Sequence, residues 1–586
     1  MNKLATIEEI NNFYQQEKNQ SFTNIEIQVI SDVTFHPLDR YIPFFLSKFE
    51  VSASFKIGLF DQLNFDLLEL TKKNENLNKI VYIHTSIIKY LVRSNEAIGS
   101  QGSDSLQKLL DNYVLNIKRA ISASPSIQFI LNLFELPPFR VRGSYSARAG
   151  EIKTISQVND AIIKLADENS NVVIHDLNYI SSRIGLDNWY DLNSWAMFKQ
   201  PFSGDGITNF SSSLASVIAS IIGKSKKVLF CDLDNTIWGG IIGDDGHQNI
   251  HIGSNTAKGE LFAIAQSYIL SLKNKGIILG ISSKNDHTNA ELGFTRKESI
   301  LSLEDFSTAM INWQPKSGNI KSMLEHLNLG ENSSVFIDDN KAEVAEVLRS
   351  LPSCSVIGFE KSPIEYIKLL DSLGFFETQQ VTEDDLNRSK NYKDNSLRTE
   401  LSKAFSDHDD FLLSLKMESN FYWNISNDPQ RVTDLVNKTN QFNTTQMKTT
   451  LSEIKKYINN SELFLLSAEL NDIYGNNGII TVVFGMIRND ELYIDNWVMS
   501  CRVFNRTMEN AVLEVLSLKS KDLGIKKIIV PFKVTSKNQY CHSYFQNLRI
   551  TSKKIDSVQC YVIIVKDYLS KIKNVNGSKI SFKINQ

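Results

Sequence analysis

Short apolar runs alternate with helical stretches over the first third of the chain. The runs are IEIQVIS, KIVYIHTS, IQFILNLF and NVVIHDL. Such alternation predicts parallel strands that are joined by crossover helices. We therefore expect a doubly wound α/β domain over residues 1–205.

A second alternating series follows the polar, glycine-containing stretch SGDGITNFSSS. Its apolar runs are KKVLFCDLDNT, GIILGISS, SSVFIDDN and SCSVIGF, with helical stretches such as ELFAIAQSYILSLKNK between them. The same reasoning predicts a second parallel sheet covered by helices. We expect this Rossmann-like α/β domain to occupy residues 206–377.

The pattern changes again beyond Thr378. A charged, helical segment comes first, and longer strands with a two-sided pattern follow it: ELFLLSAEL, GIITVVFGMI and ELYIDNWVMS. Asn/Gly and Asn/Asp turns separate these strands, as expected of antiparallel hairpins. Residues 378–586 are therefore predicted to form linker helices and an α+β domain. The fold class as a whole is multidomain α/β.

Composition and charge narrow the class of protein. With 586 residues the chain is too long for one hydrophobic core. A net charge of -3 offers no electrostatic footprint for nucleic acid or an anionic membrane surface. No apolar run approaches the roughly 20 residues that span a bilayer. We expect neither a nucleic-acid partner nor a membrane partner.

The cysteines and the first residues bear on the cellular compartment. The five cysteines are odd in number and include no C-x-x-C pair, which argues against a disulfide framework or a zinc site. The segment MNKLATIEEINNFYQQ has acidic residues and no apolar core of the kind that export signals have. Both observations favour a reducing cytoplasm.

Two acids follow the first strand of the middle series. Val228–Cys231 is predicted as a buried strand, and Asp232, Asp234 and Thr236 come directly after it. Ligands bind outside the carboxyl ends of strands in open α/β sheets. Two acids one residue apart at such an end can serve as nucleophile and as general acid/base. Taken alone, the pattern is equally typical of a solvated turn.

Three further elements follow in order. Ser282–Asn285 comes after a predicted strand, where a hydroxyl and a backbone amide can hold a phosphate oxygen or cap the next helix. Lys316 can neutralise phosphate, although a single lysine is by default a surface charge. Asp338 and Asp339 end another buried strand and suit Mg²⁺, with Asp338 preferred and Asp339 the alternative. Together the four elements indicate phosphoryl transfer.

The ordered set DLDNT, ISSKN, WQPK and FIDDN resembles the haloacid-dehalogenase (HAD) superfamily, and DLDNTIWGGIIGDDG resembles its FkbH-like group, subclass IIIC. The resemblance implies that Asp232 is the nucleophile and Asp234 the acid/base. It implies Mg²⁺ as cofactor, held by Asp232, the Asp234 carbonyl and Asp338. Phosphate and substrate binding would fall to Ser283 and Lys316, together with Thr236, Lys284 and Asn285.

The N-terminal segments ISDVTFHPL and HDLNYISSRIGLDNWYDLNSWAMFKQPFS are similar to those of the same group, whose first domain is SGNH-hydrolase-like. An active SGNH esterase needs a Gly-Asp-Ser nucleophile and a late Asp-x-x-His pair. Here Ser31 and Asp32 have no preceding glycine, and Asp191 has no histidine three residues on. We therefore expect a structural or carrier-docking role for this domain and no esterase activity.

The C-terminal third carries RVTDLVNKTNQFNTTQMK and WVMSCRVFNRTMENAVL, which resemble the FkbH-like group and a GNAT-like acyltransferase domain. The segment with Lys438, Asn440 and Gln441 either ends a helix and forms a loop or lines a substrate path between domains. GNAT folds bind pyrophosphate on a glycine-containing loop. Here side chains at Asn505 and Thr507 replace both glycines, which favours a pantetheine arm on a carrier protein over acetyl-CoA.

Cys501 directly precedes Arg502 at the end of the last predicted strand. A single cysteine is as often a buried structural thiol. Beside Arg502, and at the predicted start of a helix, positive charge would stabilise its thiolate, the form needed for nucleophilic acyl transfer. We therefore include Cys501 among the candidate catalytic residues and Arg502 among the candidate substrate-binding residues.

The resemblance also implies a reaction. In FkbH-like proteins, 1,3-bisphosphoglycerate is bound by the HAD site, its phosphate is removed, and the glyceryl group passes by thioester to an acyl carrier protein. We expect this chain to load a three-carbon acid onto a carrier protein. Two alternatives stay open: a simple phosphatase of a small phosphorylated metabolite, and a non-catalytic docking scaffold in a biosynthetic assembly.

Overall fold

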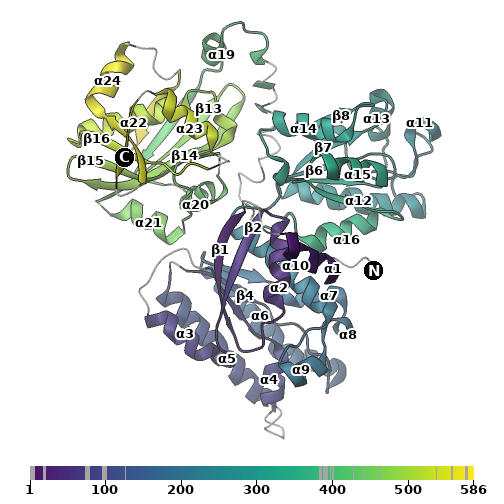
Figure 1. Ribbon diagram of the computed structural model, residues 1–586. Coiled ribbons are helices and arrows are strands. Elements are labelled where there is room, and N and C mark those ends of the chain that lie inside the picture. The colour runs from purple at the N-terminus through teal and green to yellow at the C-terminus, as the bar shows by residue number, and fades with distance from the viewer. Residues whose placement is uncertain are drawn as a thin grey trace.

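Three separate sheets organise the chain, each in its own lobe (Figure 1). The computed structural model describes residues 7–585 except 17–21, 73–79, 95–101, 126, 380, 382–385, 387–393, 396, 399–400, 427, 440, 450, 461, 536–537, 549, 556–557 and 575–578. The expectation of a multidomain α/β fold is confirmed by two parallel five-stranded sheets and one larger mixed sheet.

The N-terminal sheet is parallel and has the strand order β2-β1-β3-β4-β5. Its inner strands β3 and β4 are mostly apolar and buried, as expected where helices cover both faces, whereas β1 is buried mainly in its second half. The strands are β1 (Thr23–Ser31), β2 (Val51–Ile57), β3 (Ile80–His84), β4 (Gln128–Asn132) and β5 (Val172–His175). The helices are α1 (Ile7–Gln16), α2 (Leu38–Ser47), α3 (Leu63–Lys72), α4 (Ile87–Ser94), α5 (Gly102–Ala123), α6 (Glu151–Glu168), α7 (Leu177–Ile184), α8 (Leu186–Trp189), α9 (Leu192–Phe198) and α10 (Gly204–Ile221).

The middle sheet is also parallel, with the order β10-β9-β6-β7-β8. Its first strand in sequence, β6, therefore lies in the centre, between β9 and β7. The strands are β6 (Val228–Cys231), β7 (Ile278–Ser283), β8 (Thr308–Ile311), β9 (Ser334–Asp338) and β10 (Ser355–Gly358). The helices are α11 (Ile242–Asp245), α12 (Ala257–Asn274), α13 (His287–Phe294), α14 (Lys316–His326), α15 (Lys341–Ser350) and α16 (Pro363–Leu373).

Successive residues of β6 pack into two different cores. Val228 and Phe230 lie with residues of α14 and α15, whereas Leu229 and Cys231 lie with residues of α12 and α16. This alternation is the two-residue period of a strand that is covered on both faces. The sheet is thereby fixed from both sides, and the residues that follow its strands are held at a rigid edge.

Helix α10 connects the first two sheets. It packs against α2 and α7 of the N-terminal domain and against α16 of the middle domain. Its buried apolar residues belong to one continuous core that extends from β1 to β9. The N-terminal domain is thus packed firmly against the middle one, which gives it a part in shaping the surroundings of the middle sheet.

The C-terminal sheet is mixed, with the order β17-β18-β16-β15-β14-β13-β11-β19. Its strands are β11 (Glu418–Trp423), β12 (Phe442–Asn443), β13 (Leu463–Asp472), β14 (Gly475–Arg488), β15 (Glu491–Met499), β16 (Lys527–Pro531), β17 (Thr551–Ile555), β18 (Val558–Ile564) and β19 (Ser581–Asn585). The helices are α19 (His408–Ser414), α20 (Pro429–Lys438), α21 (Leu451–Asn459), α22 (Met508–Asp522), α23 (Gln539–Asn547) and α24 (Val565–Asn574). The antiparallel hairpins expected from the sequence are β13-β14 and β14-β15.

Neighbouring strands β15 and β16 pair in parallel at one end, where Glu491–Tyr493 faces Lys527–Ile529. Toward the other end of β15, the two-residue strand β12 pairs antiparallel with it, Phe442 opposite Met499 and Asn443 opposite Val498. Phe442 and Asn443 therefore add a short strand beside the part of β15 that does not pair with β16.

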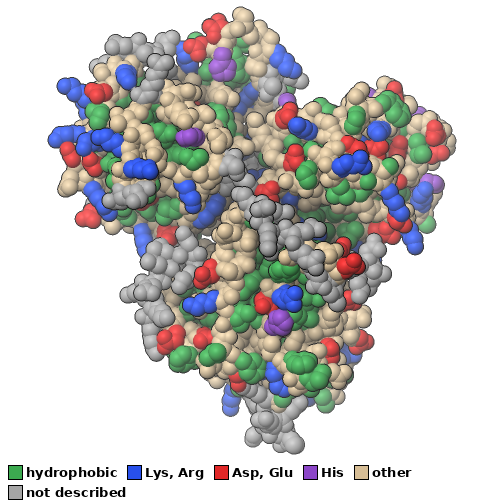
Figure 2. All heavy atoms as spheres, viewed as in Figure 1, with side chains coloured by type: hydrophobic (Ala, Val, Ile, Leu, Met, Phe, Trp, Pro, Cys, Tyr) green, Lys and Arg blue, Asp and Glu red, His purple; other side chains and the backbone are tan. Residues whose placement is uncertain are grey.

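Charges of both signs are mixed over the three lobes on the face seen in Figure 2. This distribution agrees with the small net charge of the chain. Among the described residues, no helix combines the length and apolar character needed to cross a bilayer.

Candidate active site

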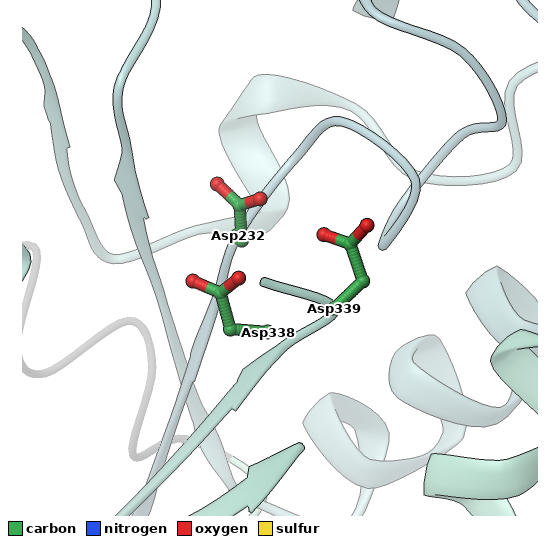
Figure 3. Close-up of side chains that lie close together, drawn as sticks. All are labelled: Asp232, Asp338 and Asp339. Atoms are coloured by element: carbon green, nitrogen blue, oxygen red, sulfur yellow. The ribbon is translucent and has the colours of Figure 1, made fainter. Parts of the chain in front are cut away.

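Three carboxyl groups meet at the carboxyl edge of the middle sheet. Asp232 follows β6. Asp338 is the last residue of β9, and Asp339 comes directly after it. Because β6 and β9 are neighbours in register, Cys231 opposite Ile337, the residues after them are brought together. One carboxylate oxygen from each acid lies within 4.8 Å of the others (Figure 3). The group has the hard oxygen donors that suit a divalent cation such as Mg²⁺.

Lys316, the first residue of α14, closes this cluster from one side. Its Nζ lies 2.8 Å from Asp232 Oδ1 and 2.6 Å from Asp338 Oδ2. All three side chains are almost fully buried. One ammonium among three carboxylates leaves two negative charges uncompensated, which is the charge that a divalent cation would neutralise.

Burial and mutual repulsion perturb the acids. Loss of solvent, together with the nearby charge of Asp232, raises the pKa of Asp338 to about 7 although Lys316 opposes the shift. The same two causes raise the pKa of Asp339 to about 6. Burial also acts against the charge of Lys316, but Asp232 and Asp338 outweigh it and raise its pKa. Strongly perturbed groups around one small space mark a candidate catalytic centre.

The carboxyl group of Asp234, two residues after Asp232, is held by three hydrogen bonds. Its Oδ1 accepts hydrogen bonds from the Trp238 indole (2.8 Å) and from the Ile242 backbone N–H (3.1 Å). Its Oδ2 accepts one from Asn285 Nδ2 (3.0 Å). Burial raises the pKa of Asp234 against these bonds. A fixed carboxyl group with a raised pKa is suited to proton transfer, the role expected of it.

The loop after Asp234 turns sharply so that Trp238 can reach back. Asn235 adopts a positive φ of 53°, which asparagine tolerates better than most residues. At Gly239 a Cβ atom would lie 2.5 Å from the ring of Phe262, and Gly240 has a φ of 102°. The two glycines of the Trp-Gly-Gly sequence are therefore required by packing and backbone conformation, and they place the indole against Asp234.

The remaining residues predicted for phosphate binding surround this centre. Ser283 ends β7 and is buried, and the buried hydroxyl of Thr236 has no hydrogen-bond partner among the described groups. Asn285 donates its side-chain hydrogen bond to Asp234, and Lys284 Nζ lies 2.6 Å from Glu343 Oε1 on α15. Sequence reasoning assigned no role to Trp238, although it lies within the DLDNTIWGGIIGDDG motif, and it missed Glu343, which no motif marks.

A cavity of about 830 Å³ adjoins the acidic cluster at Asp339. Helices α7 and α10 of the N-terminal domain contribute Arg183 and Asn209 to its wall, and the middle domain contributes Lys341 and Lys368. Its volume lies in the range of small-molecule sites. It offers room for the organic part of a phosphorylated substrate.

The other predicted residues gather elsewhere. Lys438, Gln441, Cys501 and Arg502 line a separate cavity of about 460 Å³. It also contains Lys227, which directly precedes β6, whereas Asp232 follows that strand. At about 3.3 Å per residue, Lys227 and Asp232 are about 16 Å apart along the strand. Asn440, predicted with this group, lies outside the described residues.

The surroundings of Cys501 differ from the expectation in one respect. Cys501 and Arg502 begin one turn of 3₁₀ helix (η5, Cys501–Val503), and the long helix α22 begins only at Met508. Cys501 thus stands at the start of a single 3₁₀ turn and not at the start of the long helix α22. Cys501 is half-buried, whereas the other four cysteines are buried.

The two residues that replace loop glycines keep a glycine-like backbone. Asn505 has a φ of 61° and Thr507 a φ of 58°. A positive φ is a genuine outlier for a β-branched residue. The loop thus has the left-handed turns that glycine would favour, but side chains now occupy the space beside them.

The carboxyl edge of the N-terminal sheet has a different arrangement. The Ser31 hydroxyl donates to the Val33 carbonyl (2.7 Å), and Asp191 caps α9 by accepting from the N–H groups of Asn193 and Ser194. Asp32 lies 2.9 Å from Lys89 Nζ. Ser31 and Asp32 stand where an esterase would have its nucleophile motif, and Asp191 stands where it would have its Asp-x-x-His pair. In this structure all three make contacts of a structural kind.

Glu135, just beyond β4, is fully buried and accepts a hydrogen bond from the Ser86 hydroxyl. Burial raises its pKa from 4.5 to about 7. Below pH 4.5 the acid is neutral in both states, and its burial does not destabilise the protein. As the pH rises through 7, the folded protein must bury a charge or keep the proton, and the free energy of unfolding falls by about 3 kcal/mol. We predict that Glu135→Gln melts at a higher temperature than the wild type at pH 8 but not at pH 5.

Thermal unfolding at both pH values measures this effect. Glu168→Gln, at an exposed position on α6, is the matched control. Its melting temperature should equal that of the wild type at pH 5 and at pH 8. A higher melting temperature for the wild type than for Glu135→Gln at pH 8 would contradict the prediction.

One solved structure is similar to this chain over most of its length. The N-terminal part of protein BF1531 from Bacteroides fragilis, described as containing a phosphatase domain and complexed with Mg, aligns with 64% of this chain and 100% of its own. The identity is 26% and the TM-score 0.58. The match shows that this chain shares its fold with that protein over most of its length.

Other matches cover smaller parts. The PaiA N-acetyltransferase of Thermoplasma acidophilum aligns with 20% of this chain and 68% of its own, at 15% identity and a TM-score of 0.17. A spermidine N-acetyltransferase variant of Vibrio cholerae aligns with 27% and 98%, at 13% identity and a TM-score of 0.21. No protein-family model matches the chain, and no curated protein does.

Proposed function

We propose that the middle domain is a Mg²⁺-dependent phosphatase-type centre of the HAD superfamily with Asp232 as its nucleophile. The observation that carries the proposal is the buried cluster of Asp232, Asp338 and Asp339 with Lys316 across it. The cluster stands at the carboxyl edge of a parallel sheet, where α/β proteins bind ligands. The similar Bacteroides fragilis protein, with its phosphatase domain and Mg, supports it.

Asp232, Asp234 and Lys316 have different roles in the proposed reaction. Asp232 attacks the phosphorus atom, and the bond from phosphorus to the leaving oxygen breaks, while Asp234 donates a proton to that oxygen. Asp234 then takes a proton from the water that hydrolyses the aspartyl phosphate. Lys316 holds Asp232 in place and offsets the negative charge of the phosphate.

The same residues fit a magnesium ion. Asp232, Asp338 and Asp339 would hold it, and when bound it would neutralise charge on the transferred phosphate. Asp338 accepts the Asn340 backbone N–H through Oδ1 and faces Lys316 through Oδ2, so its orientation is set by the protein.

We predict that Asp338→Asn lowers the affinity for Mg²⁺ at least about tenfold, because a charged ligand in the centre of the cluster is lost. Isothermal titration calorimetry with MgCl₂ measures this directly. Asp244→Asn is the matched control, since Asp244 is an exposed acid in the same domain. Equal affinity in wild type and Asp338→Asn would remove the acidic cluster from consideration as the metal site.

The finer proposal is an FkbH-like reaction, in which the glyceryl group of an acyl phosphate such as 1,3-bisphosphoglycerate is transferred to the thiol of an acyl carrier protein. Its support is the cavity that places half-buried Cys501 beside Arg502 and Lys438. The carrier protein as partner is part of this proposal. The separation of Cys501 from Asp232 favours the second candidate, a simple phosphatase.

Intact-protein mass spectrometry separates the two candidates. With Mg²⁺, 1,3-bisphosphoglycerate and a carrier protein bearing its phosphopantetheine arm, we predict an acylated carrier in the wild type. Cys501→Ala should release phosphate but leave the carrier unmodified. If the wild type produced free acid and no acylated carrier, the result would contradict acyl transfer and support the simple phosphatase.

A further inference from the structure

Helix α15 begins directly after the acidic cluster and is tied to it. Asn340 is its N-cap residue, and the side-chain oxygen of Asn340 accepts the backbone N–H of Ala342 (2.9 Å). The backbone N–H of Asn340 in turn donates to Asp338 Oδ1 (2.8 Å). Because one residue both caps the helix and bonds to Asp338, the position of α15 is fixed relative to the end of β9.

One face of α15 carries two glutamates, Glu343 and Glu346, which lie about one turn apart. Each of them reaches a different segment of the active site. Glu343 Oε1 lies 2.6 Å from the Nζ of Lys284, in the connection that follows β7. Glu346 contacts Ser317, the residue directly after Lys316. The same helix thus contacts two of the segments that are predicted to bind phosphate.

The contact between Glu346 and Ser317 caps α14, whose first residue is Lys316. The N-cap residue of α14 is Pro315, which makes no side-chain capping bond. Glu346 supplies the cap from another helix: its Oε2 accepts the Ser317 backbone N–H (3.2 Å), and its Oε1 accepts the Ser317 hydroxyl. The first N–H groups of a helix have no partner within the helix, and a carboxylate beside them also stabilises the positive end of the helix dipole.

The start of α14 therefore lies between two fixed elements. On one side, the Ser282 hydroxyl near the end of β7 donates to the Lys316 carbonyl (3.4 Å). On the other side, Glu346 holds the residue that follows Lys316. Helices α14 and α15 also share a core with β6, in which Ile320 and Val347 are fully buried. The backbone of Lys316 is thereby held from both directions.

We propose that Glu346 is a positioning residue of the active site: it holds the first turn of α14, and this turn directs Lys316 toward the phosphate. Lys316 Nζ lies 2.8 Å from Asp232 Oδ1 and 2.6 Å from Asp338 Oδ2. A shift of the first turn would change both contacts together. This inference rests on the proposed function, in which the cluster binds a phosphate group.

Glu346 acts at a distance from the chemistry. Among the described residues, its hydrogen bonds are with Ser317 and with the Ser350 hydroxyl of its own helix (3.2 Å). Its effect is therefore on the placement of one cation, Lys316, and not on proton transfer or on the metal ligands. Loss of Glu346 should weaken phosphate binding and leave metal binding intact.

Isothermal titration calorimetry on the full chain separates this role from a purely structural one. We expect Glu346→Ala to bind inorganic phosphate, in saturating Mg²⁺, about tenfold more weakly than the wild type, the scale of loss when a group that orients a binding side chain is removed. Its affinity for Mg²⁺ should be no lower, because the Lys316 ammonium repels a second cation at Asp232 and Asp338. A general loss of folding would weaken the binding of both.

Three further variants complete the test. Glu346→Gln keeps an oxygen that can accept the Ser317 N–H, so it should bind phosphate more tightly than Glu346→Ala. Ser317→Ala removes the hydroxyl that donates to Glu346, so its effect and that of Glu346→Ala should be less than additive in the double variant. Glu325→Ala, at an exposed acid near the other end of α14, is the matched control and should keep the wild-type affinity for phosphate.

The outcomes separate this inference from the proposed function. Equal phosphate affinity of Glu346→Ala and the wild type, or an equal weakening of phosphate and Mg²⁺ binding in Glu346→Ala, would overturn the positioning role alone. A wild type that binds no phosphate in the presence of Mg²⁺ would contradict the proposed function and, with it, this inference.

Discussion

Replacing Asp232 with asparagine is expected to reduce phosphate release at least about a thousandfold, the scale of loss when a nucleophile is removed. Asparagine has nearly the same shape, so the fold should persist, but its amide cannot attack phosphorus. The change also removes one of the two carboxylates that Lys316 contacts. Release of p-nitrophenol from p-nitrophenyl phosphate in the presence of Mg²⁺ measures the loss.

Asp244→Asn is the appropriate control for that experiment, because Asp244 is an exposed acid on the short helix α11 of the same domain. It should retain wild-type turnover. Activity of Asp232→Asn within tenfold of wild type would exclude Asp232 as nucleophile and return the assignment to another acid of the cluster.

Replacing Lys316 with methionine should have a large effect on stability as well as on turnover. Removing the cation leaves Asp232 and Asp338 buried without their partner, which typically costs about 3–5 kcal/mol. Asp338 can relieve part of this by taking up a proton, since its pKa is already raised to about 7. The destabilisation should therefore be larger at pH 8 than at pH 6.

Differential scanning calorimetry with and without Mg²⁺ measures this prediction. Magnesium should restore part of the lost stability in Lys316→Met, because the ion compensates the same carboxylates. Lys284→Met is the matched control: the Lys284 side chain is 37% exposed, so its pair with Glu343 is solvated, and surface pairs contribute at most about 1 kcal/mol. Unchanged unfolding of Lys316→Met at pH 8 would mean that Lys316 does not hold the cluster together.

The acidic cluster was predictable because strand ends are local features. Buried apolar runs followed directly by Asp232 and by Asp338 indicate strands with acids at their carboxyl edge, and parallel strands place such ends together. That β6 and β9 are neighbours was not contained in the pattern. Strand order depends on which helices cover which face, and the sequence of one strand does not carry this.

The contacts of Asp234 could not be predicted for a different reason. Trp238 reaches Asp234 because Asn235, Gly239 and Gly240 turn the loop back on itself. A turn of this kind is a property of the three-dimensional backbone. The same holds for Glu343 on α15, which meets Lys284 in the connection that follows β7.

The separation of Cys501 from Asp232 is where sequence and structure differ most. The motifs suggested one substrate path shared by both residues. The structure instead places Cys501 beside Lys227, at the opposite end of β6. Such placement depends on the packing of whole domains, and no local pattern encodes it.

The most direct test of the central claim is to trap the phosphorylated enzyme. The wild type is mixed with Mg²⁺ and p-nitrophenyl phosphate, quenched with acid, reduced with borohydride and mapped by peptide mass spectrometry. We predict that residue 232 is converted to homoserine, the product of an aspartyl phosphate, only when both Mg²⁺ and substrate are present. Phosphate release with unmodified Asp232, or with the modification at another acid, would contradict a HAD-type mechanism at this site.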